Sequence, residues 1–416
     1  MKKRLCTLMA LGVAAWPQAA PVKLTGKASL IGRASIYPGA NCTATTPPCP
    51  TINLASIDPA SPTNFAGYAD ATIRKDPQTG TLWMAYSWPN TTTGATQVVE
   101  THVAYSTDRG VTWSNSGLAN GGVLFPSQTV TNPSTGATND HTCSEVMNLY
   151  PQVVGGVTYW YGIHQTYLVQ QGAGGTGNQP NTVRFALAIA AGGPTTGPMG
   201  LATATPQYLG SSQNTDSDFS ASVNLTALSG LTNCTQFREP SLIMIGNTMY
   251  FQTSCGDLSS IAQFSTVNPQ ANPGNWVWSY VAKFATQSDA QSVCSHLNGC
   301  NQTLYFTQGD IAHSTAAAKT LMILSAVETV AGAKVSLGCV AAELATVSPP
   351  TFALDGLGNV KVDAAIASTD STADGPGSCT YDPASTTGLV MAHKVSNNAP
   401  QNGGFFTYFV ASGAKP

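Results

Sequence analysis

Five segments of the chain repeat one pattern, and this repeat limits the fold more than any other feature. Each segment has a polar or acidic start, an apolar strand, a turn, and a second strand rich in apolar and aromatic residues. A further apolar strand pair follows each of the first four segments. Four strands in each of five repeats predict an all-β propeller, in which each four-stranded antiparallel sheet forms one blade. The segments begin at Asp70, Tyr150, Glu239, Asp310 and Asp382, so successive starts are 80, 89, 71 and 72 residues apart.

The closure of the ring must come from the chain before the first repeat. We expect residues 23–37, "KLTGKASLIGRASIY", to supply the missing outer strand of the last blade. Five blades are expected, with six as the alternative if residues 21–69 hold a further blade. The run "TAAAKTLMILSAV", residues 315–327, has a helical composition, but its place in the repeat predicts a strand. Residues 21–416 are thus expected to form a single propeller domain.

The N-terminus predicts export. A basic stretch at residues 2–4 precedes an apolar run at 5–16 and small residues at 19–20, which is typical of a signal peptide over residues 1–20. No later run reaches the ~18 apolar residues of a membrane span. Only 9% of residues are charged and the net charge is -3, which argues against nucleic acid as a partner. We expect a secreted or periplasmic, monomeric protein.

The cysteines fit an oxidising compartment, in which most should pair. Nine of the ten remain after removal of residues 1–20. Proximity in the sequence suggests Cys42–Cys49, Cys234–Cys255 and Cys294–Cys300, with Cys339–Cys379 as a fourth pair and Cys143 left over. Cys294-x-His296-x3-Cys300 lacks a fourth metal ligand, and a disulfide is the favoured interpretation.

The stretch "STDRGVTW", residues 106–113, predicts a tight turn on blade one. Asp108 can accept hydrogen bonds from backbone N–H groups of its own turn. Gly110 can adopt the positive φ that such a turn requires. Trp113 can cover the hairpin, so we interpret the motif as structural and place it on the two outer strands of the blade.

Two family resemblances follow from these motifs. "STDRGVTW" and "KDPQTGTLWMAYS" resemble the Asp-box, or BNR, repeats of the sialidase superfamily. "EPSLIMIGNTMYFQTS", together with the opening Asp70, resembles five-bladed glycoside hydrolases of the arabinanase and β-xylosidase type. The latter families set an Asp on blade one, an acidic residue on blade two and a Glu on blade three, all pointing into the central funnel. The resemblance implies a carbohydrate-active enzyme with a glycan or polysaccharide substrate.

Glycoside hydrolysis needs one ionised and one protonated carboxyl group beside the scissile bond. The resemblance makes Asp70 the base and Glu239 the acid, with Glu145 and Asp310 tuning their pKa values. Blade two begins with Tyr150 rather than the expected Asp, so the tuning acid is either missing or moved to Glu145. Each of these acids has the alternative of a structural role, as a turn cap or a backbone acceptor beside the channel.

Substrate binding has four candidates. A guanidinium group suits a sugar carboxylate, and an aromatic ring can stack on a sugar face. No cofactor is expected, although His313 could hold an axial metal ion as in some five-bladed hydrolases. The candidates are Arg74, Arg238, Tyr150 and Trp88.

Two other functions stay open. One is a non-catalytic propeller that binds a glycan or a protein. The lesser one is a polysaccharide lyase, which would abstract a proton beside a neutralised uronate. Its His/Tyr/Arg set would come from His102, His141, His164, Tyr150 and Tyr161.

Overall fold

The structure, a computed structural model, describes most of the chain between residues 28 and 411. The described residues are 28–31, 51–52, 54, 57–58, 64–66, 69–92, 97–132, 135–138, 140–169, 180–255, 260–269, 272–297, 305–314, 318–330, 333–367, 374–382, 384, 389–395 and 405–411. The expected signal peptide, residues 1–20, lies outside them.

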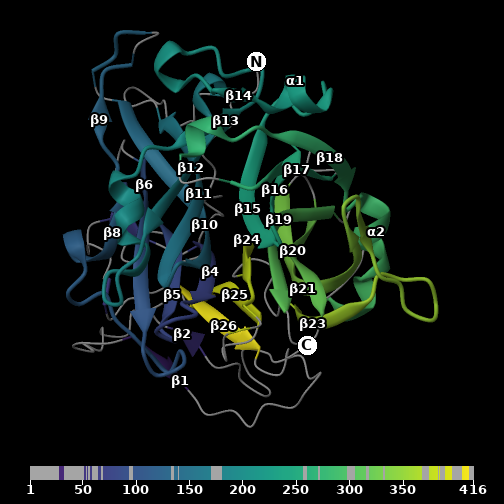
Figure 1. Ribbon diagram of the computed structural model, residues 1–416. Coiled ribbons are helices and arrows are strands. Elements are labelled where there is room, and N and C mark those ends of the chain that lie inside the picture. The colour runs from purple at the N-terminus through teal and green to yellow at the C-terminus, as the bar shows by residue number, and fades with distance from the viewer. Residues whose placement is uncertain are drawn as a thin grey trace.

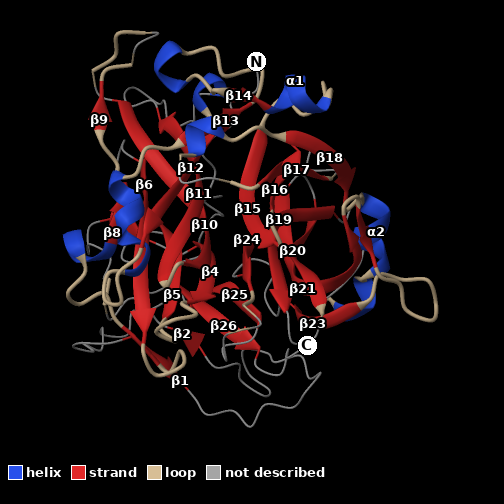
Figure 2. Cartoon of the chain, viewed as in Figure 1, coloured by secondary structure: helices blue, strands red, loops and turns tan. Residues whose placement is uncertain are grey.

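Five β-sheets make up the described fold (Figures 1 and 2). The first contains β3 (Asn64–Ala66), β4 (Ala69–Lys75), β5 (Leu82–Thr92), β6 (Gln97–Ser106) and β8 (Val123–Phe125). The second contains β9 (Thr129–Val130), β10 (Asp140–Val154), β11 (Val157–Val169), β12 (Arg184–Ala191), β13 (Gln207–Gly210) and β14 (Val223–Asn224). The third contains β15 (Phe237–Ile245), β16 (Thr248–Cys255), β17 (Ile261–Val267) and β18 (Ser279–Phe284).

The last two sheets complete the set. The fourth contains β19 (Tyr305–Ser314), β20 (Lys319–Val330), β21 (Ala333–Val347), β22 (Pro350–Phe352) and β23 (Val362–Ala367). The fifth contains β24 (Asp374–Thr380), β25 (Leu389–Val395), β26 (Phe405–Ala411), β2 (Thr51–Ile52), β1 (Ala28–Ile31) and β7 (Thr112–Trp113). Short helices α1 (Leu225–Ser229) and α2 (Gln287–Ser292) lie in the connections.

The five sheets close into a ring, which confirms the predicted all-β propeller. The first long strand of each sheet contacts that of the next sheet, in the order β4, β10, β15, β19 and β24, and β24 contacts β4 again. Neighbouring strands run antiparallel, with the exception of β13 and β14. The run predicted as strand despite its helical composition is β20, because its apolar residues are needed in the interfaces between sheets.

Each interface between neighbouring sheets holds an apolar cluster, and the interface of sheets one and two holds a second, smaller one. Trp83 of sheet one packs with Trp160 of sheet two, for example, and Phe251 of sheet three packs with Phe185 of sheet two. The other three interfaces are filled in the same way. Aromatic pairs of this kind bury large apolar areas, so the packing energy is distributed around the ring rather than held in one core.

Ring closure uses the N-terminal part of the chain, as predicted, but the strand in contact with β26 is a different one. β2 pairs with β26, and β1, which lies within the predicted residues 23–37, pairs with the outer edge of β2. β1 also pairs with β7, so the N-terminal strands join sheet five to the turn of sheet one. The need to close the ring predicted one strand in 23–37, but it could not show that two strands share the closure.

The repeat starts were placed correctly for some sheets and not for others. Asp70 and Glu239 lie near the starts of β4 and β15, whereas Tyr150 and Asp310 lie well inside β10 and β19. In the fifth sheet β24 ends before Asp382, so the predicted start was too late. The upstream halves of these strands are rich in polar residues, which hides their strand pattern in the sequence.

The turn at residues 106–113 has the predicted local geometry. Asp108 Oδ1 accepts hydrogen bonds from the Ser106 hydroxyl and the Thr112 N–H, both at 2.8 Å. Gly110 has φ 87°, and the buried Trp113 indole donates to the Gly110 carbonyl oxygen at 3.2 Å. The turn joins the outer strands of blade one as predicted, because Ser114 after the turn pairs with Tyr105 of β6 and the same segment continues to β8 at the outer edge of sheet one. The two residues of β7 pair in addition with β1 of sheet five.

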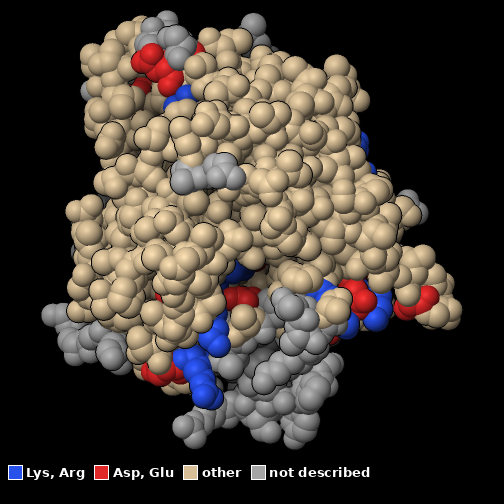
Figure 3. Space-filling view, in the orientation of Figure 1, with Lys and Arg blue, Asp and Glu red and all other residues tan. Residues whose placement is uncertain are grey.

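Two predicted disulfides are present, Cys234–Cys255 and Cys339–Cys379, and Cys143 is a buried free thiol as expected. Cys294 is also disulfide-bonded, but its predicted partner Cys300 and the predicted pair Cys42–Cys49 lie outside the described residues. No helix in the described part of the chain has the length and apolar character to cross a membrane. Uncharged side chains cover most of the face in Figure 3.

Candidate active site at the strand bulges

Three neighbouring inner strands carry the same irregularity. The pairing of β4 with β5 skips between Ala69 and Thr72, and β15 skips between Arg238 and Ser241. β10 skips in the same way between Glu145 and Asn148. Bulges of this kind re-aim side chains and occur next to active sites.

Each of the three bulges contains a residue with a left-handed backbone. Asp70 has φ 53°, Val146 has φ 53° and Glu239 has φ 57°. Non-glycine residues adopt this region at a cost of roughly 1–3 kcal/mol when other contacts hold them there, and such residues cluster at functional sites. Asp70 and Glu239 therefore occupy equivalent positions in sheets one and three, and Glu145 directly precedes the equivalent position in sheet two.

Four of the predicted site residues come together around Glu145. The pKa of Glu145 is raised to about 8, first by burial and then by the nearby negative charges of Asp70 and Glu239, against the opposing effects of Arg238 and of a hydrogen bond with Tyr167. Burial and like charges nearby favour the neutral form of a carboxyl group. Glu145 therefore keeps its proton near neutral pH, with two further carboxyl groups and one cation beside it.

Hydrogen bonds fix the acidic group from the neighbouring strands. Gln165 on β11 donates from Nε2 to Glu145 Oε1 at 3.0 Å and accepts the Glu239 N–H at Oε1 at 3.3 Å. Ser254 on β16 donates to Glu239 Oε2 at 3.3 Å. Ser87 on β5 accepts the Val146 N–H at 2.9 Å. Sequence analysis missed all three polar residues, since only the cross-strand register shows which ones face the site.

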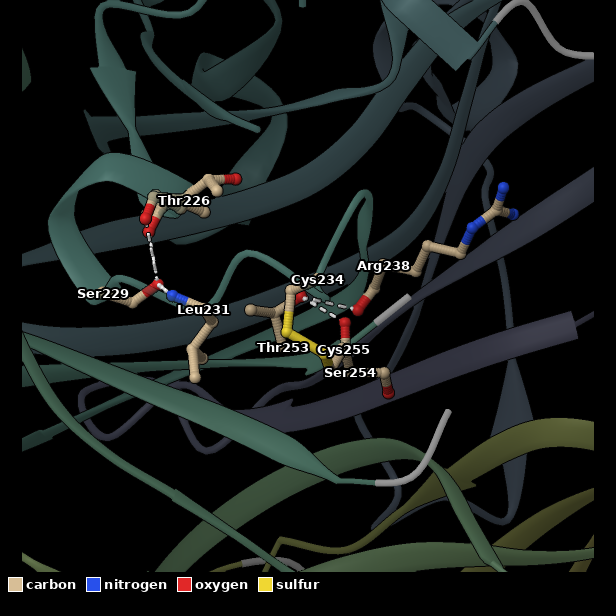
Figure 4. The surroundings of a disulfide bond; sticks show 9 residues. Thr226, Ser229, Leu231, Cys234, Arg238, Thr253, Ser254 and Cys255 are labelled. Atoms are coloured by element: carbon tan, nitrogen blue, oxygen red, sulfur yellow. Dashed lines mark hydrogen bonds between the residues drawn. A yellow bond between two sulfur atoms is a disulfide. The ribbon is translucent and has the colours of Figure 1, made fainter. Parts of the chain in front are cut away.

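Arg238 lies on β15 next to the acids, and its backbone is hydrogen-bonded to the neighbouring strand. Its carbonyl oxygen accepts a hydrogen bond from the Thr253 hydroxyl at 2.7 Å, beside Cys234–Cys255. The guanidinium extends away from that disulfide (Figure 4), and Nη2 donates to Gln236 Oε1. The Arg238 side chain is half-buried, and its positive charge lowers the pKa of Glu145.

Arg74 and Asp310 lie elsewhere, in a buried ion pair. The guanidinium binds both carboxylate oxygens of Asp310, and the two side chains are 6% and 4% exposed. Burial works against the charge of Arg74, but Asp310 outweighs it and raises the Arg74 pKa. Bidentate geometry of this kind gives a strong, directional pair.

The ion pair is the centre of a network that joins all five inner strands. Asn148 of β10 donates to Asp310 Oδ1 at 2.8 Å, and Thr380 of β24 donates to Asp310 Oδ2 at 2.8 Å. The other end of the Asn148 amide accepts the Leu242 N–H of β15 at 3.1 Å. We call Arg74, Asn148, Asp310 and Thr380 the axial network. Its polar atoms are directed at protein groups.

The remaining candidates for substrate or metal binding also contact other protein groups. Tyr150 donates its hydroxyl to the Met244 carbonyl oxygen at 3.3 Å. Trp88 stacks on the ring of His102 with centroids 4.9 Å apart. His313 Nδ1 lies 2.9 Å from the Thr320 hydroxyl. Among the described residues no group of three or more His, Cys, Asp or Glu side chains could hold a metal ion.

The histidines of the lyase interpretation are not gathered in one place. His102 lies between Asp58 and Glu100, and although burial lowers its pKa, the hydrogen bonds to both carboxylates raise it to about 9. His164 stacks on Phe125, and burial lowers its pKa to about 3. The two rings pack on opposite faces of sheet one, towards sheets five and two respectively.

Comparison with known proteins finds likeness in structure alone. No protein-family model matches the chain, and no curated protein matches it by sequence. The native arabinanase of Bacillus subtilis is similar in structure, with 13% identity, a TM-score of 0.45, and coverage of 83% of this chain and 95% of that one. The β-fructofuranosidase of Schwanniomyces occidentalis complexed with fructosyl-erythritol has 11% identity and a TM-score of 0.46, and the match covers 89% of this chain and 58% of that one. The Trypanosoma rangeli sialidase has 11% identity and a TM-score of 0.38, and the match covers 84% of this chain and 55% of that one. These identities and TM-scores are too low to transfer an activity.

Proposed function

We propose that the protein is a glycoside hydrolase that acts on a glycan or polysaccharide at the strand bulges. Asp70 is the general base, Glu239 is the general acid, and Glu145 tunes the pKa values of both. The observation that supports this most directly is the placement of Asp70 and Glu239 at equivalent bulges of two inner strands, with Glu145 at the bulge of the strand between them. Glycoside hydrolysis requires a pair of carboxyl groups, one ionised and one protonated, beside the scissile bond.

The chemistry follows from these roles. The Glu239 carboxyl group gives its proton to the glycosidic oxygen as the bond to the anomeric carbon breaks. The Asp70 carboxylate takes a proton from the water that attacks that carbon, so one water is consumed and the acid and base exchange one proton overall. A protonated Glu145 reduces the negative charge beside Glu239, and Arg238 offsets what remains.

Arg238 is the substrate-binding candidate that this proposal retains. Its guanidinium lies beside the acids and can reach the hydroxyl or carboxylate oxygens of a sugar. Arg74 and Asp310 receive a structural role, because their polar atoms bind one another and the neighbouring strands. Tyr150 and Trp88 receive a packing role on the same reasoning.

The test is a screen of purified protein against aryl glycosides and polysaccharides, with Glu239→Gln as the inactive variant. We expect hydrolysis by the natural protein and a large loss in the variant. The matched control is Ser254→Ala, which removes only one hydrogen bond to the same carboxylate and should leave most of the turnover. Binding of a glycan without hydrolysis would favour the non-catalytic alternative.

We also propose that the mature protein is exported and monomeric. The two disulfides among the described residues support an oxidising compartment. Mass spectrometry of the protein recovered from medium or periplasm should find a new N-terminus near residue 20, and sedimentation should give the mass of one chain. An intact Met1 on cytoplasmic protein would contradict the first part.

A further inference from the structure

We propose that Gln165 is a positioning residue, which sets the orientation of the Glu145 carboxyl group and of the Glu239 bulge through the two ends of one amide. The inference rests on the proposed function only in so far as it concerns catalysis. The contacts themselves belong to the protein and can be measured without a substrate.

The bulge in β15 creates the need for such a residue. Glu239 and Pro240 fall between the paired residues Arg238 and Ser241, so neither joins the ladder with β16. Pro240 has no N–H, so the Glu239 N–H is the single backbone donor that the bulge releases. Gln165 Oε1 accepts it at 3.3 Å and thereby supports the left-handed backbone of Glu239.

The second end of the amide acts on the other acid. Gln165 lies directly opposite Glu145 in the pairing of β10 with β11, and its Nε2 donates to Glu145 Oε1 at 3.0 Å. Gln165 is 2% exposed, so water cannot replace either partner easily. Because an amide has one donor end and one acceptor end, the two contacts also determine which way the side chain is turned.

Neither of two substitutions of similar size satisfies both partners. An ionised glutamate could accept the Glu239 N–H but could not donate to Glu145, and methionine could do neither. Donation of an N–H favours the ionised form of a carboxyl group, so its loss should raise the pKa of Glu145. The other groups that act on this carboxyl are Asp70 from β4, Arg238 and Glu239 from β15, and Tyr167 from β11, and the Cys143 thiol of β10 also interacts with it. The substitution leaves all of them in place.

Gln207 offers a matched control in the same sheet. It is 4% exposed, donates from Nε2 to the Trp276 carbonyl oxygen at 3.0 Å, and accepts from the Trp278 indole at Oε1 at 2.8 Å. Its amide therefore has the same two-ended use on the outer strand β13, away from the acids. Gln207→Met measures the cost of losing a buried amide that has no part in the site.

The experiment compares Gln165→Met, Gln165→Glu and Gln207→Met with the natural protein. Glutamate carboxyl carbons are labelled with 13C and titrated by NMR, with Glu145→Gln identifying the Glu145 signal, and hydrogen exchange is followed at the Glu239 amide. We expect the Glu145 titration to shift upward in both Gln165 variants, and more in Gln165→Glu, which adds a negative charge. The Glu239 amide should exchange faster in Gln165→Met but stay protected in Gln165→Glu. Gln207→Met should change neither.

Two results would overturn the inference. One is an unchanged Glu145 titration in both Gln165 variants. The other is equal protection of the Glu239 amide in Gln165→Met and the natural protein. If the titration shifts while the natural protein hydrolyses no glycoside, Gln165 keeps its positioning role and the proposed function fails instead.

Discussion

Two groups of buried charges lie on the inner strands, and they differ in how directly each carboxyl group is paired. In the axial network the Asp310 carboxylate binds one guanidinium, and the amide and hydroxyl around it fill its remaining acceptor sites. The buried Asp382 nearby accepts the backbone N–H groups of Lys75 and Ala384, and burial and the Asp310 charge raise its pKa. At the bulges three carboxyl groups, Asp70, Glu145 and Glu239, share one nearby guanidinium.

This difference indicates that the charges of the axial network stabilise the fold, whereas the acids at the bulges are available for catalysis. A saturated ion pair has no low-energy alternative, so it fixes the geometry of the strands that carry it. An excess of like charge lowers stability, and it persists where function requires shifted pKa values. Substitutions in the two groups should therefore differ in whether they reduce turnover or stability.

Glu239→Gln should separate turnover from stability. The amide keeps the size of the side chain but cannot give a proton, so we expect turnover to fall about 10²–10⁴-fold. Thermal unfolding should change little. Steady-state kinetics on a substrate found in the screen, together with a melting curve, measure both. A large loss of stability with turnover retained would reverse the roles of the two groups.

Arg74→Met should show the opposite behaviour. Removing one partner of a buried pair leaves the Asp310 charge uncompensated, and this costs about 3–5 kcal/mol in the free energy of unfolding. Denaturant unfolding measures that loss, and the double variant with Asp310→Asn should recover part of it. Loss of turnover at unchanged stability would instead place Arg74 in the active site.

Glu145→Gln should stabilise the protein in a pH-dependent way. The pKa of Glu145 is about 8 in the folded state against an ordinary value of 4.5, so the folded state binds the additional proton between these values. Stability therefore falls as pH rises through this window. The variant has no carboxyl group at this position and so does not lose stability in this window. The difference in the free energy of unfolding between the variant and the natural protein should therefore grow from pH 4.5 and reach its full size above pH 8, on the order of a few kcal/mol. Unfolding of both proteins at pH 4 and pH 9 gives the comparison, and an equal difference at the two values would contradict the coupling.

Asp108→Ala should have the smallest effect and serves as the reference for both groups. The exposed Asp108 carboxylate accepts hydrogen bonds within one turn, so its loss should cost about 1 kcal/mol. Turnover per folded molecule should stay the same, because the turn lies at the end of β6 that is remote from Ala69 and Asp70 in the register. Abolished turnover with an unchanged melting curve would place the turn in the active site.

The sequence by itself determined the propeller class, most of the inner strands, the turn at Asp108, and two disulfides. These features are local or repeat along the chain: alternating apolar residues, turn residues at fixed offsets, and cysteines near one another. It also identified Asp70, Glu145, Glu239 and Arg238 as candidates, through the resemblance and the scarcity of charged residues. Their assignment as catalytic residues stays a prediction.

Which buried charged groups pair with one another depends on the tertiary structure. Arg74 and Asp310 are 236 residues apart, and no pattern within either repeat shows that closing the ring brings them together. The same holds for Gln165, whose register opposite Glu145 depends on how β10 and β11 pair. Local residue patterns specify strands and turns, but the pairing of charges across blades depends on a ring that exists only when all five sheets have packed.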